Sequence, residues 1–245
     1  MKILAVNGSY RKKGTTTGLT EAALEGAASV GADTEMIVLR DHDVRYCTNC
    51  LMCYKHLDAE IAPCSVNDSV GELLKQIVDA DGIILASPVH NGFITGLMTV
   101  FFERIVWRIC RPTGRLLTIR GLPEPRSQKV RALATIVSAG SMPTKQGKKY
   151  CNDGTPFMKQ NGCLIFNADW AGALYAGGEF SKRMQAEDWK KAYLFKELST
   201  EQLMEARTIG IRMAELIKSG KLRPLHPLGR MGPILGTVTG WFMRS

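Results

Sequence analysis

Four closely spaced cysteines are the residues whose type and spacing most directly suggest chemistry. They follow the pattern C-x2-C-x2-C-x10-C, at Cys47, Cys50, Cys53 and Cys64. Cysteines spaced in this way can face one centre when their loop wraps around it, and four thiolates are the ligands that a [4Fe–4S] cluster requires. Four thiolates also suit a structural zinc ion, and vestigial or redox-active thiols are a third interpretation. We expect a metal centre here, with the iron–sulfur cluster favoured.

A polar segment from Gly8 to Thr17 has the chemistry of a phosphate site. Its two glycines allow tight turns, its hydroxyls supply uncharged donors, and the helix that follows adds free N–H groups and a positive dipole end. The segment lacks both the Walker pattern and the dinucleotide fingerprint, which favours the phosphate of a mononucleotide. A capping loop without a ligand is the alternative. The expected phosphate ligands are Ser9, Arg11, Thr15, Thr16 and Thr17.

The elements that must position these residues alternate between strands and helices. Short apolar runs predict five strands, at residues 2–7, 35–39, 82–87, 132–137 and 163–168. Helical spacing of apolar residues predicts helices at residues 17–30, 68–80, 95–108 and 200–219, the second capped by Asp68 and the last opened by a capping box at Ser199. This alternation predicts an α/β fold, a flavodoxin-like doubly wound five-stranded parallel sheet of order 2-1-3-4-5. Ligands bind such sheets at the carboxyl ends of the strands.

The segment SPVHNGFITG, from Ser87 to Gly96, follows the third predicted strand. It resembles the S-P-V-Y-x-G-x-x-T-G loop of the flavodoxin-like NAD(P)H-dependent FMN reductases and iron–sulfur flavoproteins. The segment after the first strand resembles their G-S-x-R-x-x-G-x-T phosphate site. The iron–sulfur flavoproteins also carry a compact cysteine motif after the second strand, with a shorter last gap. The resemblance covers residues 1–107 well and resumes more weakly at 137–141 and 206–210, and His90 replaces the family's usual Tyr.

The resemblance implies that two loops frame the isoalloxazine ring of FMN. The residues concerned are Pro88, Val89, His90, Asn91, Gly92 and Phe93 on one side, and Ser138, Ala139, Gly140 and Ser141 on the other. Anchoring in the core is the alternative for Phe93, and an exposed loop position is the alternative for His90. Glycine in such a loop allows the backbone to approach a flat ring closely.

The same resemblance implies an FMN-dependent oxidoreductase. Electrons would pass between NAD(P)H or a ferredoxin-like donor, FMN and a [4Fe–4S] cluster on the four cysteines. An NAD(P)H:FMN or quinone reductase without a cluster is one alternative, and a flavin electron carrier that turns over no small substrate is another. Because a flavin performs the redox chemistry itself, we assign no catalytic acid or base.

The chain has 245 residues, of which 45% are hydrophobic and 22% are charged. This composition suits a globular domain and excludes a disordered chain or a disulfide mini-protein. We place one flavin-binding domain at residues 1–220, with a cysteine-motif insertion at about 44–66 and further insertions at 109–129 and 141–162. Residues 221–245 form an apolar and basic tail.

The net charge of +9 is concentrated between residues 104 and 131 and in the tail. We exclude nucleic acid as a partner, because the sequence shows neither a known binding fold nor aromatic residues interleaved with the charges. The basic segments are expected to form a rim around the flavin cleft. This rim would attract an anionic partner, either NAD(P)H or an acidic redox protein. A solvated surface without a partner is the alternative.

The apolar tail predicts an interface, and we expect a homodimer or homotetramer, with membrane binding disfavoured. The sequence shows no signal peptide and no run long enough to span a bilayer, which favours a cytoplasmic protein. Cysteines in that compartment stay reduced. The three outside the motif are expected to be packed or free thiols, and they are Cys110, Cys151 and Cys163.

Overall fold

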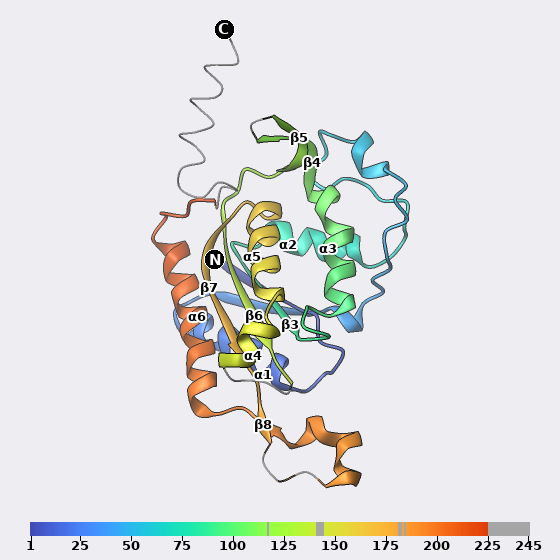
Figure 1. Ribbon diagram of the computed structural model, residues 1–245. Helices are drawn as coiled ribbons and strands as arrows, with labels where there is room; N and C mark the ends of the chain where they lie inside the picture. The colour runs from blue at the N-terminus through green and yellow to red at the C-terminus, as the bar shows by residue number, and fades with distance from the viewer. Residues whose placement is uncertain (117, 141–144, 181–182, 184, 225–245) are drawn as a thin grey trace.

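The computed structural model describes residues 1–116, 118–140, 145–180, 183 and 185–224 (Figure 1). Its centre is a five-stranded parallel sheet of order β2-β1-β3-β6-β7. This is the predicted 2-1-3-4-5 order, with two further strands inserted between the third and fourth. The strands are β1 (Lys2–Asn7), β2 (Asp33–Val38), β3 (Gly82–Pro88), β6 (Arg131–Ser138) and β7 (Ala168–Ala176).

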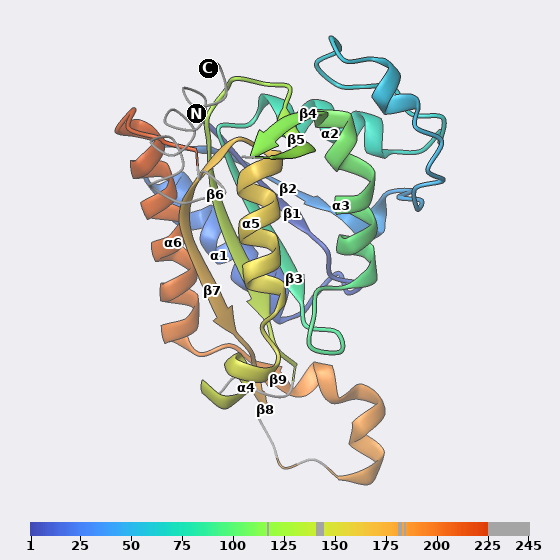
Figure 2. The same cartoon turned by 45° about the horizontal axis from the view of Figure 1, so that its top comes forward.

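Helices cover both faces of the sheet (Figures 1 and 2). One face carries α1 (Thr15–Ser29) and α6 (Thr200–Lys218), and the other carries α2 (Val70–Asp79), α3 (Gly96–Ile109) and α5 (Gly154–Ile165). The predicted capping box is confirmed at the start of α6, where Ser199 Oγ accepts from the N–H of Gln202. No helix in the part of the chain that the structure describes is long and apolar enough to cross a membrane.

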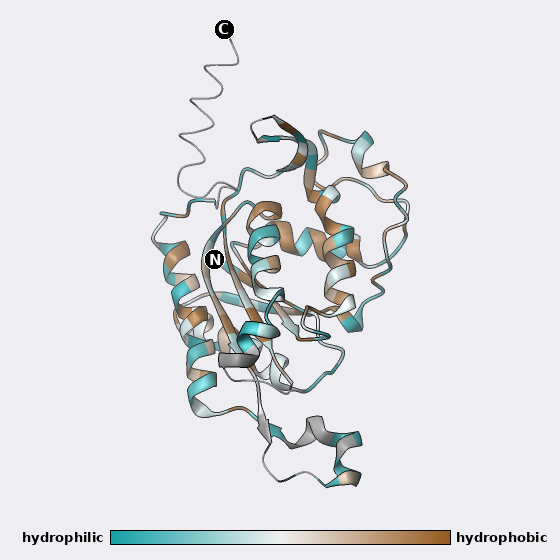
Figure 3. Cartoon of the chain, viewed as in Figure 1, coloured by the Kyte–Doolittle hydropathy of each residue, from teal (hydrophilic) through white to brown (hydrophobic). Residues whose placement is uncertain are grey.

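The core is built from strands that are buried on both faces, as expected for a parallel sheet. All eight residues of β6 and six of the seven residues of β3 are buried. Figure 3 shows hydrophobic residues concentrated in the strands and in the helices that flank them, whereas α6 alternates between the two colours along its length. The sheet is therefore a rigid platform for the loops at its carboxyl edge.

Helices α1 and α6 approach each other backbone to backbone. A Cβ on Gly210 would lie 1.8 Å from the carbonyl oxygen of Ala23, and one on Gly26 would lie 2.2 Å from the carbonyl oxygen of Arg207. Only glycine allows contacts this close. This seam fixes α6, near the end of the described chain, against the helix that follows β1.

The predicted fifth strand is wrong. Residues 163–165 belong to the last turn of α5 and residues 166–167 connect it to the fifth strand, β7, which begins at residue 168. Cys163, Ile165 and Phe166 are buried because the end of this helix packs on the sheet. A short apolar run cannot distinguish a buried helix end from a buried strand, which explains the error.

The segments outside the predicted plan also have structure. Residues 109–129 contain an antiparallel hairpin of β4 (Cys110–Leu116) and β5 (Ile119–Pro125), and α4 (Lys145–Tyr150) precedes α5. A small two-stranded sheet joins β8 (Glu179–Phe180) to β9 (Lys196–Glu197). Short 3-10 helices complete the described chain, at Leu39–Asp41, Met52–Lys55 and Ala186–Phe195. Ser141 and the tail after residue 224, both named in the sequence analysis, lie outside the described residues.

Candidate functional site

Three loops meet at the carboxyl ends of β1, β3 and β6. The hydroxyl of Thr16, in the first turn of α1, lies 2.5 Å from the hydroxyl of Ser138 at the end of β6. The backbone N–H of Val89, directly after β3, donates to the carbonyl oxygen of Ser138 at 2.8 Å. Ser138 therefore joins all three loops. They lie beside the point where the strand order reverses, which is where doubly wound sheets bind ligands.

The first loop is ordered by a residue that the sequence analysis missed. The side chain of Asn7 accepts from the N–H of Ser9 at 2.9 Å and donates to Thr17 Oγ1 at 3.1 Å. Ser9 Oγ in turn accepts from the N–H of Arg11 at 3.1 Å. Helix α1 begins after Gly14, which has no side chain to cap it. The N–H groups of its first turn are therefore suited to an anion.

The second loop is a tight two-residue turn. His90 and Phe93 exchange two backbone hydrogen bonds, of 2.8 Å and 3.0 Å. Asn91 and Gly92 between them have φ values of 50° and 78°, the pair of positive angles that a type I′ turn requires. The Asn-Gly dipeptide is the sequence signal for this turn, which the sequence analysis did not use.

Aromatic contacts fix both sides of this turn. The His90 ring stacks on Tyr10, with ring centroids 5.4 Å apart and planes inclined by 27°. Tyr10 in turn accepts a hydrogen bond on its hydroxyl from the N–H of Leu97 at 3.1 Å. Phe93 packs edge to face against Phe157 at 5.0 Å and joins the core. The structure thus favours the core-anchor interpretation for Phe93 and gives His90 an aromatic partner from the first loop.

A lysine from the second half of the chain lies beside the first and third loops. The position of a Cβ on Gly178 would be 2.7 Å from Thr15 Cγ2 and 3.0 Å from Lys196 Cβ. The Nζ atom of Lys196 lies 3.8 Å from the position of a Cβ on Gly140. Burial lowers the pKa of Lys196, and the nearby Arg11 guanidinium lowers it further. Because the positive charges of Arg11 and Lys196 lie near each other, this corner is suited to an anion.

The four motif cysteines surround one pocket away from this edge of the sheet. Cys47, Cys50, Cys53 and Cys64 line the pocket together with Arg104 and Trp107 of α3. Because α3 follows β3 and returns toward the amino ends of the strands, its second half lies away from the three loops. The two candidate sites therefore contact opposite halves of α3 (Figure 1).

The thiols differ in their surroundings. The hydroxyl of Ser65 donates to Cys50 Sγ at 2.9 Å and lowers the pKa of that thiol to about 7. Burial raises the pKa of Cys53, and the three neighbouring thiols of the motif raise it further. The motif thiols are therefore close enough to Cys53 to influence its ionisation.

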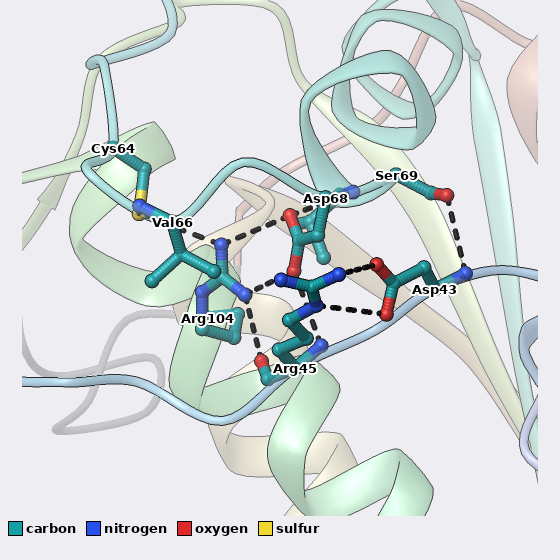
Figure 4. A network of polar contacts seen from close by, with 8 residues as sticks. Asp43, Arg45, Cys64, Val66, Asp68, Ser69 and Arg104 are labelled. Atoms are coloured by element: carbon teal, nitrogen blue, oxygen red, sulfur yellow. Dashed lines mark hydrogen bonds and ion pairs between the residues drawn. The ribbon is translucent and has the colours of Figure 1, made fainter.

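A buried ion pair connects α3 to both ends of the cysteine segment (Figure 4). Arg104 forms a two-pronged ion pair with Asp68, and both side chains are almost fully buried. The same guanidinium donates to the carbonyl oxygen of Arg45 at 2.7 Å and to Cys64 Sγ at 3.4 Å. The N–H of Val66 is a second donor to Cys64 Sγ, also at 3.4 Å. Asp68 accepts at 3.2 Å from the first N–H of α2, but its main partner is Arg104 rather than the helix that it was predicted to cap.

The predicted basic rim around the flavin cleft is wrong for three of its residues. Arg104, Arg126 and Arg131 are buried, with exposed fractions of 2%, 6% and 3%. Their guanidinium groups bind backbone carbonyl oxygens or, for Arg104, also a carboxylate and a thiol. A guanidinium presents five donors, so it can satisfy several loop carbonyls that regular structure leaves unpaired. These charges stabilise loops instead of attracting a partner.

The cysteines outside the motif agree with the prediction of packed or free thiols, since none of the three forms a disulfide. Cys110 and Cys163 are buried, and burial raises the pKa of each thiol to about 12. Cys151 is partly exposed.

Among the described residues, no three His, Cys, Asp or Glu side chains are placed to hold a single metal ion. The four motif thiols line a pocket instead of converging on one point. A [4Fe–4S] cluster takes one thiolate for each iron, so its ligands surround a volume. The all-thiol donor set therefore fits a cluster that occupies the space between the four thiols.

The sheet order and the loops that converge at its carboxyl edge define a flavodoxin-like α/β protein. The model of the family described as NADPH-dependent FMN reductase matches residues 1–140. The chain belongs to this family.

Curated relatives match a shorter part of the chain. An iron–sulfur flavoprotein of Methanocaldococcus jannaschii is 38% identical over 104 residues, which cover 42% of this chain and 51% of the relative. An iron–sulfur flavoprotein of Methanosarcina thermophila is 32% identical over 106 residues, which cover 43% and 53%. The chain spans about half the length of the curated relatives it matches.

Solved structures resemble the fold over most of the chain. An azoreductase has a TM-score of 0.59 at 13% identity, covering 86% of this chain and 100% of its own. The NAD(P)H:quinone oxidoreductase of Methanothermobacter marburgensis has a TM-score of 0.57 at 15% identity, covering 86% and 98%. A flavone reductase has a TM-score of 0.56 at 21% identity, covering 90% and 64%.

Proposed function

We propose that this protein is an FMN-dependent oxidoreductase that takes electrons from NAD(P)H and carries a [4Fe–4S] cluster on its four motif cysteines. The observation that carries the flavin half of this proposal is the meeting of three loops at Ser138. Its contacts with Thr16 and Val89 bring together the segments proposed to bind phosphate and ring. Membership of the FMN reductase family supports the same cofactor.

The first loop would hold the FMN phosphate. Ser9, Thr15, Thr16 and Thr17 supply hydroxyls, and the N-terminus of α1 supplies backbone N–H groups. Arg11 and Lys196 supply positive charge at the same corner. A dianionic phosphate would offset the repulsion between these two cations, since each gains an oppositely charged neighbour.

The second and third loops would frame the isoalloxazine ring. FMN, when bound, supplies the capacity to accept a hydride and to pass electrons on singly or in pairs. The type I′ turn at Asn91 and Gly92 presents a rigid backbone edge, and the Tyr10–His90 stack limits the orientation of the histidine ring. Ala139 and Gly140 follow β6 on the other side. The protein would thereby orient the ring.

The four cysteines would hold the cluster. The supporting observation is that four thiols line one pocket, with two N–H donors on Cys64 Sγ and buried guanidinium groups behind. The names of the curated relatives point in the same direction. An acidic redox protein as a partner, and assembly into a homodimer or homotetramer, stay predictions.

The test is anaerobic purification followed by flavin, iron and sulfide analysis and an NADPH oxidation assay. We expect one FMN and about four irons and four sulfides per chain, as a [4Fe–4S] cluster requires. NADPH should reduce the flavin rapidly. FMN without iron would favour a reductase that has no cluster. A flavin that NADPH cannot reduce would favour a simple electron carrier. No flavin binding after reconstitution would refute the proposal.

A further inference from the structure

The stretch from residue 45 to residue 68 carries all four motif cysteines with little regular secondary structure. The structure describes every residue of this stretch, and its one regular element is the 3-10 turn Met52–Lys55. We call this stretch the cysteine loop. A long loop loses much conformational entropy when it is ordered, so specific contacts must hold it in place.

Arg104 contacts both ends of the cysteine loop. Its guanidinium binds the carbonyl oxygen of Arg45 before the first cysteine, and it binds Cys64 Sγ and Asp68 at the far end. The side chain comes from the middle of α3 and is 2% exposed. One rigid group on a packed helix therefore sets the distance between the two ends of the loop.

Arg126 contacts the middle of the same loop. Its Nη1 atom donates to the carbonyl oxygens of His56, Leu57 and Ala59 at 2.6 Å, 2.9 Å and 2.9 Å. Its Nη2 atom donates to the carbonyl oxygen of Cys53 at 3.1 Å. Further hydrogen bonds, to Cys110 and Trp107, tie the side chain to β4 and α3.

Among the described residues, Arg126 donates hydrogen bonds only to backbone carbonyl oxygens, although its side chain is charged and the residue is only 6% exposed. Burial lowers its pKa, which shows that the charged form loses solvation here. A buried charge is costly unless it is well hydrogen-bonded. Removing it leaves its buried hydrogen-bond acceptors without a donor, which is also costly. The carbonyl oxygens of Cys53, His56 and Ala59 would then lose this donor, whereas that of Leu57 would keep a hydrogen bond of 2.6 Å from Arg111 Nε.

We propose that Arg104 and Arg126 form a clamp that folds the cysteine loop into its ligand arrangement before a cluster is present. Arg126 positions the central part of the loop, beginning at Cys53, and Arg104 joins its ends. The N–H donation from Arg104 to Cys64 Sγ would also raise the reduction potential of a bound cluster, because hydrogen bonds to sulfur stabilise the more negative reduced form. This second consequence rests on the proposed function, whereas the folding of the loop does not.

The experiment compares Arg126→Met with Arg120→Met, a matched control on the exposed part of the same hairpin. Hydrogen exchange is measured on the metal-free, FMN-bound full-length protein, in peptides that cover residues 47–64. We expect exchange in these peptides to rise at least about tenfold in Arg126→Met, equivalent to losing about 1.4 kcal/mol of local stability. Arg120→Met should match the wild type, and FMN affinity should stay within about twofold in both variants. Iron incorporation should fall in Arg126→Met alone.

Wild-type exchange across residues 47–64 in Arg126→Met would overturn the clamp. If Arg126→Met does not fold, Arg126→Lys replaces it, because one ammonium group cannot reach the same set of carbonyl oxygens. The lysine variant should exchange faster than the wild type in the same peptides, and equal exchange would overturn the proposal. In the iron-loaded protein, Arg104→Lys should lower the midpoint potential measured by electron paramagnetic resonance. If the wild-type protein takes up no iron, the proposed cluster is refuted. The clamp would still be tested separately by the hydrogen-exchange measurement.

Discussion

Replacing Lys196 with methionine tests whether the corner beside the first loop binds a phosphate. Methionine keeps the length and most of the apolar stem of the side chain but removes the charge. Lys196 lies beside Thr15 and Gly140. Unlike those two residues, Lys196 is outside the part of the chain that the family model matches. A hydrogen bond to a charged group contributes about 1.5–3 kcal/mol. Because Lys196 is only partly buried, we take the lower end, which corresponds to about a tenfold loss of affinity.

The assay is a titration of flavin fluorescence with the metal-free protein, run in parallel with FMN and with riboflavin. Lys196→Met should raise the Kd for FMN about tenfold and leave the Kd for riboflavin unchanged, because riboflavin lacks the phosphate. Lys191→Met is the matched control, since Lys191 is an exposed lysine of the preceding 3-10 helix. An equal loss of affinity for both flavins would show that Lys196 supports the fold or contacts the ring instead of the phosphate. Unchanged affinity for both flavins would refute a role of Lys196 in binding FMN.

The pH dependence gives an independent check on the same lysine. Burial and Arg11 lower the pKa of Lys196 from its usual value of 10.5. The charged form of Lys196 is lost as the pH rises through this lowered pKa. In the wild type, the ratio of FMN affinity to riboflavin affinity should fall as the pH rises through the pKa of Lys196. In Lys196→Met this ratio should depend less on pH. Equal pH profiles for the two proteins would contradict the assignment.

Further predictions concern the packing that supports the site. Gly210→Ala should lower the free energy of unfolding in urea by about 1–3 kcal/mol, because the new methyl group would meet the carbonyl oxygen of Ala23. Thr95→Val should cost about 1–2 kcal/mol in the same measurement, since Thr95 Oγ1 caps α3 and donates to the carbonyl oxygen of Gly8 at 2.8 Å. Thr16→Val should weaken FMN binding about tenfold in a fluorescence titration, and Thr16→Ser should restore it; unchanged binding in the valine variant would contradict a role for this hydroxyl.

The sequence predicted the inner strands of the central sheet well, because these strands are buried on both faces and form continuous apolar runs. Residues 82–87 and 132–137 are examples, and the order of the five strands followed from the alternation with helices. The same kind of signal failed at residues 163–168. There the apolar side chains belong to a helix end that packs on the sheet, and hydrophobicity alone cannot separate the two cases.

The parts of the candidate site formed by residues close in sequence could be predicted from the sequence. The contacts between residues distant in sequence could not. The cysteine spacing and the hydroxyl run are local patterns. In contrast, Arg104 pairs with Asp68 across 36 residues, and Arg126 reaches Cys53 across 73. Such contacts depend on the tertiary fold, so the charge pattern was interpreted as a solvent-facing rim. The aromatic pair of Tyr10 and His90 was missed for the same reason, because its two rings come from different loops.

The seam between α1 and α6 has a consequence for how this chain can be divided. The family model ends at residue 140, yet α6 packs its backbone directly on α1, which begins at Thr15. Cutting the chain near residue 140 would remove both α6 and the edge strand β7, leaving Leu19, Ala23 and Ala27 without part of their cover. We therefore expect the matched and unmatched parts to unfold as one cooperative unit, so that neither could be exchanged between proteins without its counterpart.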